Sequence, residues 1–89
     1  MTTTTVTTLR EDEVFVTGWT DCDPHTSLSE MYRKRAKLVV GLWIKADGGR
    51  WQWEVYDVRD QVLESGREQS DIDARTAAEA SAKRILLAA

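Results

Sequence analysis

Two segments near the middle of the chain alternate between apolar and polar residues with a period of two. They span 38–46 and 51–58, and such alternation is typical of strands that bury one face. Residues 47–50 lie between them and read Asp-Gly-Gly-Arg, a strong signal for a hairpin turn centred on either the Asp-Gly or the Gly-Gly pair. Both registers place even-numbered residues of the first strand opposite odd-numbered residues of the second. The pattern therefore predicts an antiparallel hairpin with a defined set of side chains on each face.

The two faces of the predicted hairpin differ in composition. One face is apolar and consists of Leu42, Ile44, Trp51, Trp53 and Val55. The other face is mixed and consists of Val39, Trp43, Lys45, Gln52, Glu54, Tyr56 and Val58. We expect the apolar face to form the core, because the burial of large apolar side chains is the main favourable term in folding.

The C-terminal third of the chain predicts one more strand and a helix. A turn at 59–61 leads into a strand from Val62 to Glu68, and Ser70 with Asp73 forms the start signal of a long final helix. Mostly small residues line one side of this helix: Ala74, Ala77, Ala78, Ser81, Ala82 and Ile85. Small side chains allow close packing against a sheet face that carries tryptophans. We therefore expect the helix to cover the apolar face of the hairpin.

The N-terminal part of the chain has a less regular pattern. Residues 1–12 are rich in threonine and then acidic, which predicts a solvated tail. The residues at 13–19 favour a strand, and the Asp-Pro step within 21–27 favours a loop. Over 27–36, a capping-box pattern and the helical spacing of apolar residues favour a short helix. A rival interpretation extends the following strand backwards, because apolar residues at even-numbered positions continue through this stretch.

These elements together predict an α+β fold. It has an antiparallel sheet of three or four strands, an alanine-rich C-terminal helix packed on one face, and a short helix before the hairpin. A length of 89 residues suits one domain, which we place at 13–89. Cys22 is the one cysteine, which excludes an internal disulfide. The chain has neither a membrane-spanning apolar run nor a signal-peptide pattern, which predicts a cytoplasmic protein without a membrane partner.

Few residues are arranged for catalysis or metal binding. Cys22 and His25 lie close together, but a structural zinc site needs four ligands and no second pair follows. The carboxylates are scattered over turns and helix positions, whereas general acid–base catalysis needs groups positioned in a cleft. The sequence therefore predicts a protein that is not an enzyme, has no catalytic residue, and binds no metal, cofactor or small-molecule substrate.

Two groups of residues are candidates for contact with a partner. The first group lies on the mixed hairpin face and consists of Trp43, Tyr56, Val58 and Lys45. Aromatic residues there can anchor a protein partner or a second copy, unless an earlier element of the chain covers them. The second group is the one basic cluster and consists of Arg33, Lys34, Arg35 and Lys37. We expect a protein-binding module that self-associates. Nucleic-acid binding through the basic cluster is the alternative, which the net charge of −3 disfavours.

The order of elements also carries a resemblance. With a helix over 27–36, the order is α-β-β-β-α, and the Ser-Gly step at 65–66 and the alanine-rich stretch at 74–78 fit the same scheme. This arrangement resembles the double-stranded-RNA-binding domains over about two thirds of the chain. The resemblance implies RNA contacts at the start of the last helix, where this chain has Asp-Ile-Asp at 71–73 instead of lysines. The W-x-W-x-V strand at 51–55 and the alanine-rich end also resemble short proteins of actinobacteria and their phages, which implies a host protein as target.

Overall fold

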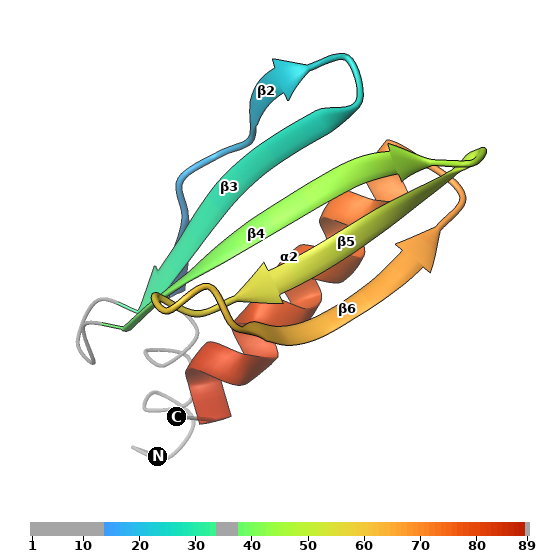
Figure 1. The fold of residues 1–89 in the computed structure, drawn as a ribbon. Coiled ribbons are helices and arrows are strands. Elements are labelled where there is room, and N and C mark those ends of the chain that lie inside the picture. Colours follow the sequence, from blue (N-terminus) through green and yellow to red (C-terminus); the bar gives the residue numbers. More distant parts are fainter. Residues whose placement is uncertain (1–13, 34–37, 89) are drawn as a thin grey trace, which may run out of the picture.

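A computed structural model describes residues 14–33 and 38–88, which form one antiparallel sheet and one helix (Figure 1). The elements are β1 (Val14–Val16), β2 (Thr20–Asp23), β3 (Thr26–Arg33), β4 (Leu38–Asp47), β5 (Arg50–Tyr56), β6 (Val62–Glu68) and α2 (Asp71–Ala88). The order across the sheet is β1-β3-β4-β5-β6, and β2 also pairs with β3. The expected α+β class is confirmed, with six strands where three or four were expected. The tail expected at 1–12 lies outside the described residues.

The central hairpin forms as its pattern predicts. Its turn consists of Gly48 and Gly49, whose φ angles are 56° and 85°. Positive φ is easy for glycine and strained for residues with a Cβ, which explains the choice of these two residues for a two-residue turn. The turn pairs even-numbered residues of β4 with odd-numbered residues of β5, for example Ile44 with Trp53. Of the two turns that the sequence allows, the Gly-Gly turn is the one that forms, and the predicted even-with-odd pairing and apolar face are confirmed.

The helix expected over 27–36 is wrong, because residues 26–33 form the strand β3. β3 pairs antiparallel with β4 along its full length. Its odd-numbered residues Ser27, Ser29 and Met31 are buried, whereas the even-numbered residues between them are exposed. This alternation is the signature of a strand with one covered face. The rival strand interpretation had the right type of element, but β3 is a separate strand that runs against β4 rather than a continuation of it.

Two short strands pair with the outer side of β3. β1 occupies part of the strand expected at 13–19 and pairs Phe15 with Tyr32. β2 lies where a loop was expected over 21–27, so the connection to β3 is reduced to a turn at Pro24 and His25. The backbone groups of 20–23 gain partners along the edge of β3, which compensates for their weak strand propensity.

Polar contacts join α2 to both sides of the sheet. Beside β2, the indole Nε1 of Trp19 donates a hydrogen bond of 2.6 Å to Glu79 Oε2, and the guanidinium of Arg75 lies 5.5 Å from the centre of the Trp19 ring. On β6, Arg84 forms a hydrogen-bonded ion pair with Glu64, and this bond lowers the pKa of Glu64. These contacts attach the helix to the sheet near both edge strands, β2 and β6.

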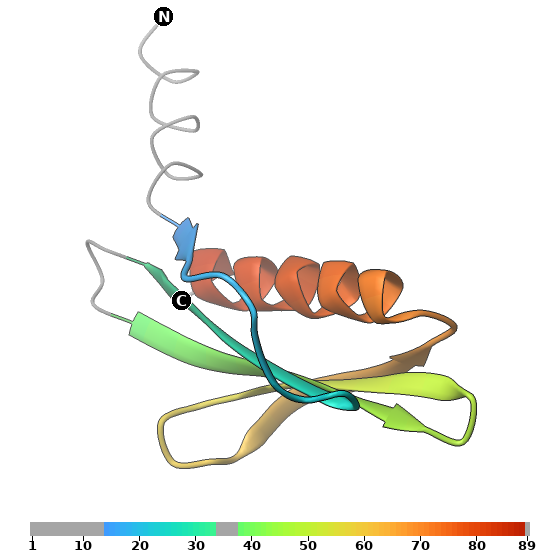
Figure 2. The same ribbon diagram turned by 90° about the horizontal axis from the view of Figure 1, so that it is seen from above.

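The helix covers one face of the twisted sheet, and Figure 2 shows the sheet edge-on with the helix along that face. The buried core consists of Met31, Val40, Leu42, Ile44, Trp53, Val55, Ala74, Ala78, Ala82 and Leu86. The expected pairing of small helix residues with large sheet residues is confirmed, since three alanines of α2 are fully buried against the sheet. Close approach of the two layers maximises dispersion contacts without voids.

The cap at the start of α2 allows a test of this local structure. The Ser70 hydroxyl accepts a hydrogen bond of 3.1 Å from the backbone nitrogen of Asp73. Ser70→Ala removes this acceptor, and we expect the free energy of unfolding to fall by about 1 kcal/mol. Urea denaturation measures the change, and Ser70→Asp is the control that keeps an acceptor in place. Equal stability of wild type and Ser70→Ala would show that the cap does not stabilise the helix.

Candidate protein-binding face

The sheet face opposite α2 carries a continuous set of large side chains, which we call the open face. It is built by alternate residues of neighbouring strands in the registers that the sheet fixes. Its members include Phe15, Leu28, Glu30, Tyr32, Val39, Gly41, Trp43, Lys45, Gln52, Glu54, Tyr56 and Val62, and Ser65 and Arg67 of β6 extend it. Within residues 14–33 and 38–88, no helix lies over this face. The open face is therefore where the predicted exposure of aromatic side chains can be checked.

Many apolar side chains on the open face remain accessible. The exposed fractions are 42% for Phe15, 36% for Leu28, 38% for Tyr32, 37% for Val39 and 51% for Val62. The rings of Phe15 and Tyr32 stack with centroids 5.6 Å apart, so they present one aromatic surface. Single exposed apolar residues are normal, whereas a group of neighbouring ones on a rigid face makes the open face a candidate interaction surface.

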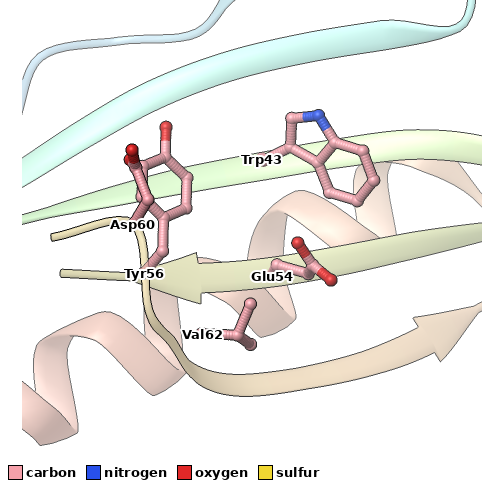
Figure 3. Close-up of a pocket in the computed structure, with 5 residues that line it drawn as sticks. All are labelled: Trp43, Glu54, Tyr56, Asp60 and Val62. Carbon is pink, nitrogen blue, oxygen red and sulfur yellow. The ribbon is translucent and has the colours of Figure 1, made fainter.

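Trp43 and Tyr56 are half-buried at the centre of the open face. A hollow of about 240 Å³ lies beside them, and we call it the acidic cup. It is lined by Trp43, Glu54, Tyr56, Asp60 and Val62. Figure 3 shows the two rings standing apart on adjacent strands, with Glu54 and Val62 below the space between them and Asp60 beside the tyrosine. The cup thus combines two aromatic rings with two carboxylates.

Gly41 explains how Tyr56 reaches its position. A Cβ at residue 41 would lie 2.3 Å from the Tyr56 ring, so the ring rests directly on the glycine backbone. The pKa of Tyr56 is raised, first by burial and then by the nearby charges of Asp60 and Glu30. A raised tyrosine pKa means that the neutral phenol is favoured there. Burial and the two carboxylates, Asp60 and Glu30, both act in this direction.

Asp60 reaches the cup from the turn between β5 and β6. It has a left-handed backbone, with φ of 62°, which aspartate tolerates better than most residues. Its backbone nitrogen donates a hydrogen bond of 3.0 Å to the Asp57 carbonyl. The Asp57 carboxylate accepts hydrogen bonds of 2.8 Å from the nitrogen of Arg59 and 3.0 Å from that of Gln61. This network gives the turn a defined shape and so positions the Asp60 carboxylate.

The structure brings three of the four predicted partner-binding residues to the open face. Trp43 and Tyr56 border the cup, and Lys45 is exposed one row away, opposite Gln52. Val58 lies instead in the turn after β5, where it is 77% exposed. It also lines a different hollow, between the end of the sheet and the end of α2. Val58 was misplaced because β5 ends at Tyr56, two residues earlier than the alternation suggests.

The basic cluster gives a different picture. Arg33 is on the face of β3 that α2 covers, and its guanidinium donates a hydrogen bond of 3.1 Å to the Leu86 carbonyl near the end of the helix. Lys34, Arg35 and Lys37 lie outside the described residues. The structure therefore places Arg33 against the helix, and the nucleic-acid role of the cluster stays a prediction.

Residues that could perform chemistry are dispersed over the described part of the chain. Cys22 is exposed on β2, and the backbone nitrogen of His25 donates to Asp23 Oδ1 at 2.8 Å in the adjoining turn. Among residues 14–33 and 38–88, no group of three or more His, Cys, Asp or Glu residues could hold a metal ion. The hollow beside Val58 has a volume of about 420 Å³ and is lined by apolar residues apart from Asp57, whose carboxylate is engaged in the turn.

Sequence reasoning missed several contributors to the open face and the cup. Phe15, Leu28 and Tyr32 were assigned to other elements, and Asp60 was treated as an ordinary turn residue. The alternation of Leu28, Glu30 and Tyr32 was the available signal for the first group.

No protein-family model, curated protein or solved structure matches this chain. In the described ranges, no helix is long and apolar enough to cross a membrane.

Proposed function

We propose that this protein is a non-enzymatic protein-binding module that self-associates through its open face. The observation that carries the proposal is the row of accessible aromatic and aliphatic side chains on the sheet face opposite α2. The resemblance to short phage proteins implies a host protein as the target, and the same face could bind such a protein. Under this proposal the folded scaffold supplies a surface, and no bond is made or broken.

The composition of the open face suits binding. Trp43 and Tyr56 sit at its centre, and side chains of this type are the commonest anchors of protein interfaces. They are held on a sheet, so they lose little conformational entropy when a partner covers them. Lys45, Gln52 and Glu54 lie beside them in the register and would form part of a polar rim.

A charge placed at Trp43 tests the proposal. Trp43→Glu should leave the protein folded, because Trp43 is on the face that the core does not use. It should weaken self-association at least tenfold, since an unpaired carboxylate buried in an interface costs more than about 1.4 kcal/mol. Light scattering behind a sizing column over a range of protein concentrations measures association, and circular dichroism checks the fold.

Ile72→Glu is the matched control. Ile72 is an apolar residue of α2 that is 70% exposed and lies away from the open face. The same glutamate there should leave association unchanged. A wild type that stays monomeric at all concentrations, or equal losses in both variants, would contradict the proposal. Unfolding of Trp43→Glu would show that Trp43 belongs to the core.

The nucleic-acid alternative makes the opposite prediction for salt. Binding through Arg33, Lys34, Arg35 and Lys37 would weaken steeply as salt rises, because phosphate contacts release condensed counterions. Association through an aromatic surface should change little over the same range. Binding of a mixed-sequence duplex RNA that disappears at high salt, with no self-association, would favour the alternative.

A further inference from the structure

We propose that the acidic cup is an anchor site for one cationic side chain of a protein partner, with arginine as the preferred residue. This inference rests on the proposed function, because it concerns what the open face takes up when it binds. It adds a chemical identity to the occupant, which the aromatic surface alone does not specify.

The size of the cup suits a single side chain. Its volume is about 240 Å³, below the roughly 300–1,000 Å³ of sites for drug-sized ligands. It is a shallow hollow, open to solvent on the sheet surface rather than enclosed, and Figure 3 shows the five side chains that line it. A side chain that projects from a partner's surface can therefore enter without rearrangement of the sheet.

The rings of the cup favour a cation. Trp43 and Tyr56 border the hollow from β4 and β5. The face of an indole or phenol ring attracts a positive charge, and indole does so most strongly. Arginine profits more than lysine, because its planar guanidinium stacks on rings and is less strongly hydrated.

The charges of the cup act in the same direction. Glu54 and Asp60 line the hollow, and none of the five lining residues is basic. Glu54 Oε2 accepts a long hydrogen bond of 3.4 Å from Gln52 Nε2, a donor that carries no positive charge. Among the described residues, the ion pairs of the structure join other carboxylates and leave both of these available. A guanidinium in the cup would supply the missing positive charge and several hydrogen-bond donors.

The carboxylates near Tyr56 act in the same direction. Its pKa is raised by burial first and then by Asp60 and Glu30, so acidic groups surround the ring on the side of the cup and on the side of β3. The charges of Asp60 and Glu30, which act on the phenol in addition to burial, would also attract a cation beside the ring. An organic cation fits this arrangement better than a metal ion, since the described residues offer no metal-binding cluster.

A peptide titration tests the inference on the full chain. The probes are N-acetyl-Gly-Arg-Gly-amide and the same peptide with citrulline, a neutral isostere of arginine. The readout is the set of indole N–H signals in nitrogen–proton NMR spectra, with the Trp43 signal assigned by its loss in Trp43→Phe. The arginine peptide should shift the Trp43 signal saturably. It should leave the Trp53 signal in place, because the Trp53 indole is buried and donates to Glu68.

Neutralising variants show whether the carboxylates matter. Glu54→Gln and Asp60→Asn should each weaken peptide binding about two- to fivefold, the range for partly exposed ion pairs. Asparagine tolerates the left-handed backbone at residue 60, so Asp60→Asn should keep the turn. Asp73→Asn is the matched control, because it removes a negative charge from an exposed position of α2, outside the open face. The control should bind the peptide like wild type.

The outcomes separate this inference from the proposed function. Equal shifts with the arginine and citrulline peptides, or equal binding by the wild type and both cup variants, would overturn the cationic anchor. Self-association that Trp43→Glu abolishes would still support the open face in that case. Conversely, specific arginine binding by a strictly monomeric wild type would support the cup and contradict self-association.

Discussion

Trp53→Ala should lower the free energy of unfolding by about 3–5 kcal/mol, the usual range for truncation of a buried large aromatic residue. The Trp53 side chain is 7% exposed and lies in the core beneath α2. Its ring covers Gly66, where a Cβ would lie only 2.7 Å from the indole nitrogen. Its Nε1 also donates a hydrogen bond of 3.2 Å to Glu68. Removal of the ring therefore leaves a cavity and strips the carboxylate of a donor.

The expected loss is large in relation to the whole protein. Domains have a net stability of about 5–15 kcal/mol, and small ones lie at the lower end. Urea denaturation followed by far-ultraviolet circular dichroism measures the change without relying on tryptophan fluorescence. Trp43→Ala is the matched control, since Trp43 is half-buried on the open face, and its loss of stability should be clearly smaller. Equal losses for the two variants would contradict the assignment of faces.

Ala78→Leu should destabilise the protein by about 1–3 kcal/mol through overpacking. Ala78 is fully buried in the stripe of small residues that lets α2 lie close to the sheet. Three additional carbon atoms there would force the helix away from its partners or push side chains off their rotamers. The shift of the thermal unfolding midpoint measures the effect.

Ala80→Leu provides the comparison within the same helix. Ala80 is on the exposed side of α2, and leucine and alanine have similar helix propensities. We expect this variant to unfold at nearly the wild-type temperature. A midpoint for Ala78→Leu as high as that of Ala80→Leu would show that the two layers can separate to accept a larger side chain.

The sequence by itself determined the parts of the fold that rest on contacts between neighbours in the chain. The glycines at 48 and 49 favour the positive φ of a tight turn, which fixed the hairpin and the side chains on each of its faces, although the structure chose between the two possible registers. The bounds of β6 were predicted as observed, and the helix start at Ser70 follows from its cap. The stripe of small residues on α2 matches the large residues of the hairpin by size alone. In each of these cases the signal is local: a turn, a cap, or a repeating pattern of side chains within one element.

Tertiary structure alone decided the type of β3 and the shape of the cup. The stretch over 27–36 fits a short helix and a strand about equally well, and the edge of β4 selects the strand by pairing with its backbone groups. Once β3 is a strand, Leu28 and Tyr32 join the open face. Asp60 reaches the cup because the hydrogen bonds of Asp57 shape its turn. These features depend on partners distant in sequence or on backbone angles, and hydrophobic periodicity alone does not determine either.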